Sequence, residues 1–119
     1  MIPAEPRRCL TAVVPCFNEA ATVSALLGRV LDSPWIAEVI AVDDGSSDGT
    51  LDAIRSVDDP RVTLLEHGAN RGKGAALRTG FSAATADYVI IQDADLEYDP
   101  AEYGYLLEPP VGERMRKRR

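Results

Sequence analysis

The chain has 119 residues, of which 45% are hydrophobic and 27% charged; this predicts one soluble globular domain and excludes a disordered or collagen-like protein. Five of its thirteen basic residues fall within residues 114–119, so residues 1–113 hold the other eight against all nineteen acidic residues, a net charge of −11. Such an acidic body repels nucleic acid phosphates, which excludes DNA and RNA as partners and means that any bound phosphate needs a cation as intermediary.

Residues 1–8 carry charges but lack the apolar run of a signal peptide, and they are expected to form a flexible N-terminus. No later window approaches the roughly 20 apolar residues of a membrane span. Cys9 and Cys16 form no CxxC pair and have no histidine nearby, which favours reduced thiols over a redox or metal role. A cytoplasmic protein is therefore expected.

The first predicted elements are a strand and a helix. The apolar run over residues 10–14 is short and rich in β-branched residues, so it predicts a buried strand that Pro15 ends. Apolar residues then recur at helical spacing until residues 32–34 end the pattern, namely Val23, Leu26, Leu27, Val30 and Leu31.

A second strand is predicted over residues 38–42, followed by a loop of Asp, Gly and Ser over residues 43–49. Ser47 or Asp48 is a suitable N-cap for the helix that follows, which carries Leu51 and Ile54.

The second half repeats this order, with a strand at residues 61–65, a glycine-rich connection at 68–74, a helix at 75–84 and a strand at 88–91. The inner face of that third helix is predicted to hold Ala76, Leu77, Phe81 and Ala84. The alternation of strands and helices predicts a three-layer α/β/α fold with a mainly parallel, Rossmann-like sheet. Ligands of such sheets bind beyond the carboxyl ends of the strands, where most of the unusual polar residues fall.

Two carboxylates, Asp93 and Asp95, stand one residue apart just after the fourth predicted strand. Both can reach one divalent cation if the chain bends there, and hard cations such as Mg²⁺ or Mn²⁺ prefer oxygen ligands. Such an ion has open positions for a nucleoside diphosphate and neutralises it as a leaving group. Glu97 can add a further ligand, and the alternative is a solvated turn.

Asp43 and Asp44 form a second acidic pair, at the end of the second predicted strand. A carboxylate there can accept hydrogen bonds from a base N–H or from ribose hydroxyls. The alternative, an Asx-turn and helix cap, fits Ser47 and Asp48 best.

The segment 68–74 resembles a phosphate-binding P-loop but fails its spacing, because three residues rather than four precede Gly72-Lys73 and Gly74 follows the lysine. Its basic residues, Lys73 among them, can still contact a diphosphate or support a base pocket; a glycine-rich turn with solvated charges is the alternative. His67 stands alone in the sequence and is interpreted as a structural or surface histidine.

Four segments in order, at residues 13–19, 42–50, 70–74 and 92–96, closely resemble family 2 glycosyltransferases of the GT-A fold. Within that family they are most similar to the branch of dolichol-phosphate mannose synthases and polyprenyl-phosphate glycosyltransferases. The resemblance covers residues 9–108, and it implies a nucleotide-sugar-binding domain there.

The resemblance also implies roles for individual residues. Pro15, Phe17 and Glu19 line the nucleotide pocket, and Val42 and Asp44 hold the nucleoside. The diphosphate and the metal are bound by the segment Gln92, Asp93, Ala94 and Asp95, whose two aspartates are the implied catalytic residues.

The implied reaction is a metal-dependent, inverting transfer of a sugar from a nucleotide-diphospho-sugar, of the GDP-mannose or UDP-glucose type, to a polyprenyl or dolichyl phosphate. Such an acceptor places the protein peripherally at the cytoplasmic face of a membrane. Family members run well beyond residue 108, so a nucleotide-sugar-binding fragment without turnover is the alternative.

The basic residues 109–119 are expected to form a disordered tail. The other interpretation is a basic segment that contacts an anionic membrane surface.

A receiver domain phosphorylated on aspartate also clusters acids at strand ends. That class of protein needs a lysine late in a strand, and the sequence shows none.

Overall fold

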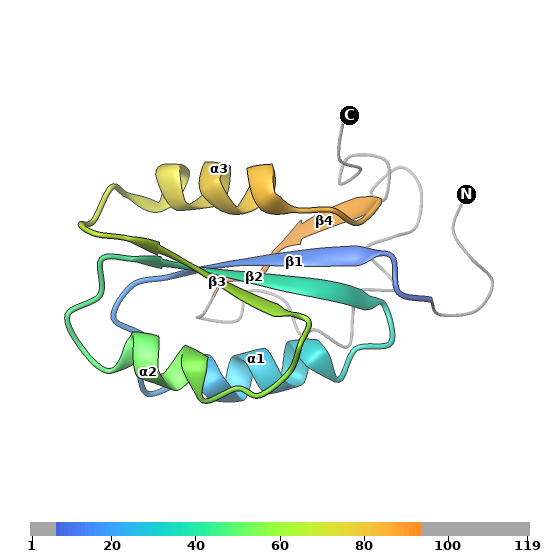
Figure 1. The fold of residues 1–119 in the computed structure, drawn as a ribbon, viewed down its shortest axis with the longest axis horizontal. Helices are drawn as coiled ribbons and strands as arrows, with labels where there is room; N and C mark the ends of the chain where they lie inside the picture. The colour runs from blue at the N-terminus through green and yellow to red at the C-terminus, as the bar shows by residue number, and fades with distance from the viewer. Residues whose placement is uncertain (1–6, 94–119) are drawn as a thin grey trace.

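The computed structural model describes residues 7–93, which form a four-stranded parallel sheet with helices on both faces (Figure 1). In chain order the elements are β1 (Leu10–Cys16), α1 (Val23–Leu31), β2 (Ile36–Asp44), α2 (Thr50–Arg55), β3 (Val62–His67), α3 (Lys73–Ala83) and β4 (Tyr88–Ile91). The predicted α/β fold with a parallel sheet is confirmed. Several predictions fall outside the described residues. They concern most of the N-terminus (residues 1–6), the tail at 109–119, and the site residues Ala94, Asp95 and Glu97.

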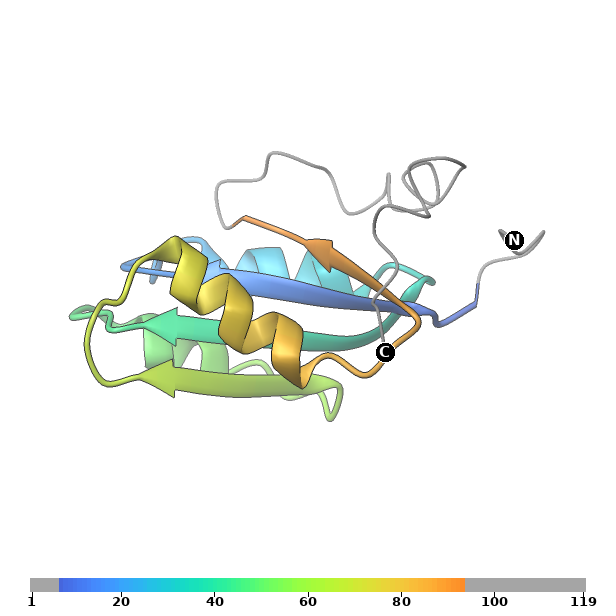
Figure 2. The same ribbon diagram turned by 90° about the horizontal axis from the view of Figure 1, so that it is seen from above.

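The strand order is β3-β2-β1-β4, so the chain reverses its direction of travel across the sheet once. Helices α1 and α2 cover one face as the chain moves outward from β1 to β3, and α3 returns over the opposite face to place β4 on the other side of β1 (Figures 1 and 2). A reversal of this kind leaves a crevice beyond the carboxyl ends of the strands that flank it, here β1 and β4.

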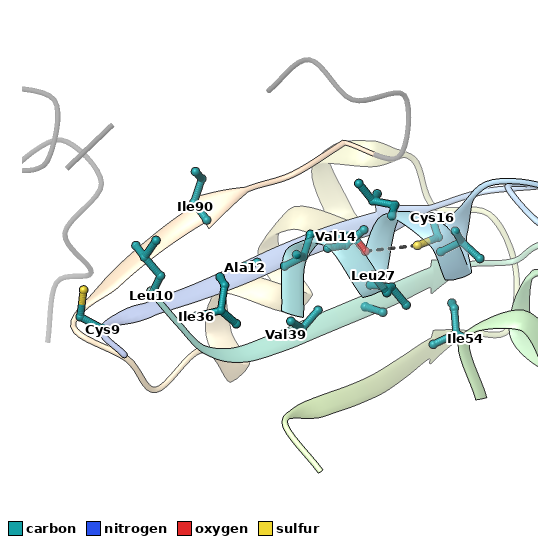
Figure 3. Close-up of a cluster of buried hydrophobic side chains, with 14 residues drawn as sticks. Cys9, Leu10, Ala12, Val14, Cys16, Leu27, Ile36, Val39, Ile54 and Ile90 are labelled. Carbon is teal, nitrogen blue, oxygen red and sulfur yellow. Dashed lines mark hydrogen bonds between the residues drawn. The ribbon is translucent and has the colours of Figure 1, made fainter. Parts of the chain in front are cut away.

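The larger hydrophobic cluster lies between the sheet and the helices α1 and α2 (Figure 3). Alternate residues of β1, namely Ala12, Val14 and Cys16, belong to it, together with the buried stripe of α1. That stripe is Val23, Leu26, Leu27 and Val30, as the helical spacing predicted. Residues that alternate along a strand point to opposite faces, so Val13 belongs to a second cluster under α3.

Helix α3 packs unusually close to the sheet because Gly80 faces it. A Cβ atom built on Gly80 would lie 2.4 Å from Cγ1 of Val13, closer than any real side chain tolerates. The inner face of α3 is therefore formed by Ala76 and Gly80, its two buried residues. The prediction that Phe81 faces the core is wrong: it lies one position beyond Gly80, about 100° further round the helix, and is 44% exposed.

The prediction that Pro15 ends the first strand is also wrong, since β1 continues to Cys16 and pairs with β2 throughout. The carbonyl of Val13 accepts a hydrogen bond from the N–H of Gln92, so the backbone of Val13 faces β4. Pro15 lies two residues on and directs its nitrogen to the same side, beyond the last paired residue of β4. The missing N–H therefore breaks no hydrogen bond of the sheet.

The second strand is longer than predicted, because it runs from Ile36 through Asp44 and pairs with β3 up to His67. The N-cap position of α2 is Gly49 rather than Ser47 or Asp48. Asp48 instead accepts the backbone N–H of Thr50 at 2.9 Å, which is the predicted Asx-turn.

Candidate functional site

A cavity of about 280 Å³ lies beyond the carboxyl ends of β1, β2 and β4, beside the N-terminus of α3. Six of the residues predicted to form the site line it, namely Pro15, Phe17, Glu19, Asp44, Lys73 and Asp93. The remaining lining residues are Cys16, Asn70, Gly72 and Ala76. The structure therefore brings together residues that are up to 78 positions apart in the sequence, at the edge of the sheet where they were expected.

Two predicted residues, Val42 and Gln92, do not line this cavity. The side chain of Val42 is fully buried in the cluster under α3, and Gln92 is also fully buried. Their roles toward a nucleotide stay predictions, as do those of Ala94, Asp95 and Glu97 outside the described residues.

The two loops that follow β1 and β2 are joined by hydrogen bonds. Asn18 adopts a left-handed backbone conformation with φ of 52°, which asparagine tolerates better than most residues. Its N–H donates to Ser46 Oγ at 2.9 Å, and its Oδ1 accepts the N–H of Ser47 at 2.9 Å. The neighbouring N–H of Glu19 donates to Thr50 Oγ1 at 2.9 Å. These bonds fix the loop that carries Phe17 and Glu19 at the cavity.

A third loop, after β3, closes over the second because Gly45 has no side chain. A Cβ atom on Gly45 would lie 2.5 Å from the backbone nitrogen of Asn70. The φ angle of Gly45 is 76°, a conformation that also disfavours any residue with a side chain. The sequence places Gly45 within a loop, but it does not reveal this contact, because the partner lies 25 residues away.

Asp44 is held in place by three donors from the loop and strand opposite. Its Oδ1 accepts hydrogen bonds from the N–H of Arg71 at 2.9 Å and from Nδ1 of His67 at 2.8 Å, and its Oδ2 accepts the N–H of Gly72 at 2.9 Å. Burial favours a raised pKa for this carboxyl, but the three hydrogen bonds outweigh it and hold the pKa below its ordinary value. Asp44 is therefore a carboxylate that only accepts hydrogen bonds.

His67 is buried, and its second ring nitrogen, Nε2, lies 2.9 Å from Oγ1 of Thr79 on α3. The prediction of a structural histidine is therefore confirmed, with the addition that it contacts a residue of the cavity. The glycine-rich segment likewise supports the pocket, through the backbone N–H groups of Arg71 and Gly72.

Asp43 points away from the cavity, toward the face covered by α1 and α2. Its Oδ2 accepts the N–H of Ser46 at 3.2 Å, whereas its buried Oδ1 has no hydrogen-bond partner within residues 7–93. Burial, together with the carboxylates of Asp43 and Glu19, raises the pKa of Cys16 to about 12. Its thiol stays protonated and contacts the carbonyl of Val14 (Figure 3).

Lys73 and Asp93 meet at the rim of the cavity, where Nζ lies 2.6 Å from Oδ1 of Asp93. Lys73 is the first residue of α3 and Asp93 follows β4, so the pair spans the crevice between these elements. The carboxylate of Asp93 is a hard oxygen donor at the opening of an acidic cavity, which fits a divalent cation. Within the described range no group of three or more metal-ligating side chains is gathered, and the other predicted ligands follow residue 93.

These features together define a parallel α/β protein with an acidic, aromatic-rimmed cavity at the reversal point of its sheet. The model of the family described as glycosyl transferase family 2 matches residues 11–110, and the chain belongs to that family.

Among curated relatives, the chain is 37% identical over 108 residues to an undecaprenyl-phosphate 4-deoxy-4-formamido-L-arabinose transferase of Aeromonas hydrophila, which covers 85% of this chain and 33% of the relative. It is 34% identical to the uncharacterized glycosyltransferase YaiP of Escherichia coli over 111 residues, covering 88% of this chain and 27% of that protein. The chain thus spans about a third of the length of these relatives.

Solved structures agree with this assignment. A mannosyltransferase of Pyrobaculum calidifontis in complex with GDP-Man and Mn²⁺ matches with a TM-score of 0.72 and 32% identity, over 87% of this chain and 33% of the other. Glucosyl-3-phosphoglycerate synthase of Mycobacterium tuberculosis with UDP matches with a TM-score of 0.71 and 25% identity, over 87% of this chain and 40% of the other. No helix among residues 7–93 is long and apolar enough to cross a membrane.

Proposed function

We propose that this chain is the donor-binding part of a glycosyltransferase that moves a sugar from a nucleotide-diphospho-sugar to a polyprenyl phosphate. One observation carries the proposal: the cavity combines a half-exposed aromatic ring, Phe17, with the carboxylate of Asp44 and the charged pair of Lys73 and Asp93. A ring and a carboxylate suit a nucleoside, and charges at the rim suit a diphosphate.

The donor and the acceptor are inferred from different relatives. The structures of similar proteins contain GDP-Man with Mn²⁺ or UDP, which supports a nucleotide-sugar donor. The relative from Aeromonas hydrophila is named as an undecaprenyl-phosphate transferase, which supports a lipid phosphate acceptor. Since such an acceptor lies in a membrane, we further propose a peripheral position at its cytoplasmic face.

A divalent cation, Mg²⁺ or Mn²⁺, is part of the proposal. Among residues 7–93, three acidic residues and one lysine line the cavity, namely Glu19, Asp44, Asp93 and Lys73, so we propose that an anionic diphosphate needs added positive charge there. Asp93 would hold the ion with Asp95 and Glu97, and the ion would stabilise charge on the departing nucleoside diphosphate. The chain's own residues align the donor, and the acceptor phosphate, which is already anionic, attacks without a strong general base.

The second candidate function is nucleotide-sugar binding without turnover. It is favoured by the lining of the cavity, whose ring, carboxylates and lysine suit a nucleoside and a diphosphate.

Two measurements on the whole chain test these functions. Calorimetric titration with GDP and UDP, each with and without Mn²⁺, is expected to show binding that requires the ion. A transfer assay with radiolabelled nucleotide sugars and undecaprenyl phosphate then separates the candidates: labelled lipid supports the transferase, whereas ion-dependent binding without labelled lipid supports the binding protein. Absence of binding to either diphosphate would contradict both.

A further inference from the structure

The hydrogen bonds of Asp44 leave little room for a ligand. An ionised carboxylate offers about four acceptor positions, two on each oxygen. Within the described residues, Oδ1 already accepts two hydrogen bonds, from His67 and Arg71, and Oδ2 accepts one, from Gly72. One position remains, and it is on Oδ2. Asp44 lines the cavity, so this position is the one that a bound nucleoside can use.

His67 keeps this arrangement from changing. The side chains of His67 and Asp44 are each 5% exposed, and hydrogen bonds at both ring nitrogens hold the imidazole in place. In the neutral ring, Nδ1 donates to Asp44 and Nε2 accepts from the hydroxyl of Thr79 on α3. The imidazole of His67 thereby connects the carboxylate of Asp44 to helix α3, and its Nδ1 keeps one acceptor position of Oδ1 filled.

We infer that His67 is a specificity-determining positioning residue, which leaves Asp44 able to accept a single hydrogen bond from the nucleoside and so favours uracil over guanine. The inference rests on the proposed nucleotide-binding function. Uracil presents one N–H, at N3, between two carbonyl groups, and one acceptor position satisfies it. Guanine presents two donors side by side, N1–H and the N2 amino group, and these require one free position on each carboxylate oxygen.

A guanine in this cavity would leave one of its donors without a partner. An unsatisfied donor shielded from water is costly, and sites of this kind discriminate strongly between ligands that differ by one hydrogen-bonding group. UDP is therefore expected to bind at least about tenfold more tightly than GDP in the presence of Mn²⁺.

Two substitutions of His67 separate its two contacts. In His67→Asn the amide nitrogen takes the position of Nδ1 and still donates to Asp44, so the preference for UDP should persist within about threefold. In His67→Gln the amide reaches the position of Nε2 near Thr79 but leaves Oδ1 without that donor. GDP should then gain affinity relative to UDP, and the ratio of the two dissociation constants should fall about tenfold.

The test is calorimetric titration of UDP and GDP with Mn²⁺ on the wild-type chain and both variants, after circular dichroism and thermal unfolding have shown that each is folded. Equal affinity for the two diphosphates, or tighter binding of GDP by the wild type, would overturn the inference while leaving the proposed function standing. An unchanged ratio in a folded His67→Gln variant would equally overturn it. Binding of neither diphosphate by the wild type would contradict the proposed function and the inference together.

If His67→Gln does not fold, His67→Leu tests the same contact, since it removes the donor to Oδ1 of Asp44 while filling a similar volume. A lower ratio of UDP to GDP affinity supports the inference, and an unchanged ratio contradicts it.

Discussion

Lys73 pairs with Asp93 at the rim of the cavity, and this pairing bears on how a ligand enters the site. The lysine side chain is 58% exposed and the aspartate 16%, so the flexible partner of the pair can move while the carboxylate stays in place. A divalent ion bound by Asp93 would free the ammonium group to contact the diphosphate. The ammonium group of Lys73 therefore neutralises the charge of Asp93 before a ligand binds.

Asp93→Asn should abolish binding that depends on Mn²⁺, because an amide is a much weaker ligand for a hard cation than a carboxylate. The affinity for a nucleoside diphosphate in the presence of Mn²⁺ is expected to fall at least about tenfold, as measured by calorimetry. Asp52→Asn is the matched control, since that aspartate is 91% exposed on α2, outside the cavity. Equal losses in both variants, or none in Asp93→Asn, would remove Asp93 from the metal site.

Cys16 should resist alkylation in the folded protein. Burial and two neighbouring carboxylates raise its pKa to about 12, so the reactive thiolate is scarce at pH 8, and the residue is only 1% exposed. Mass spectrometry after treatment with iodoacetamide should show Cys16 unmodified in the native chain and modified after denaturation in guanidinium. Rapid labelling of Cys16 in the native chain would mean that the strand end opens readily.

At the scale of elements, α3 determines the geometry of the site from above the sheet. Lys73 is its first residue and Thr79 lies in its second turn. Its inner face consists of Ala76 and Gly80, which lets it lie close to β1 and β2. The low apolar content of this face explains why the helix was predicted with the wrong inner residue: periodicity identifies large side chains, whereas here the smallest ones face the core.

Gly80→Ala should destabilise the protein by about 1–3 kcal/mol, because the added methyl group meets Val13 at 2.4 Å and forces the helix away from the sheet. Gly28→Ala is the matched control within α1, where an added Cβ meets nothing within 4 Å. That change should stabilise the chain by up to about 1 kcal/mol through helix propensity. Urea denaturation measures both, and a neutral Gly80→Ala would mean that α3 packs further from β1 than described.

Much of this element pattern could be predicted from the sequence. Each strand and helix falls close to its predicted range, because apolar runs and stripes record local burial. The contacts between loops could not be predicted in the same way. The bonds from Asn18 to Ser46 and Ser47, and the approach of Gly45 to Asn70, join residues that only the folded sheet brings together. The partners of His67 were missed for the same reason.

At the scale of the whole molecule, Glu38 connects three segments at the end of the sheet opposite the cavity. Its Oε1 accepts hydrogen bonds from the hydroxyls of Thr11 on β1 and Thr85 after α3, and from the backbone N–H of Thr85. Burial works to raise the pKa of this carboxyl, but the hydrogen bonds outweigh it and lower the pKa below its ordinary value.

Because the pKa of Glu38 is lower in the folded chain than in the unfolded one, its contribution to stability is present above the unfolded pKa and is lost as the pH falls through the folded pKa. Glu38→Gln should therefore lower the free energy of unfolding by about 1 kcal/mol at pH 7 and by less near pH 3. Urea denaturation at both pH values measures the difference. A loss of equal size at the two pH values would assign the effect to packing instead of charge.

Pro15 has a consequence for the readiness of the site. Two parallel strands extend their pairing through successive backbone N–H donors. The nitrogen of Pro15, which faces β4, carries no hydrogen and cannot donate. The pairing of β1 with β4 therefore cannot extend through Pro15, because that residue has no backbone N–H. The space beyond Pro15, between the ends of β1 and β4, stays open before any ligand binds. A nucleotide that bound there would therefore use none of its binding energy to separate the two strands.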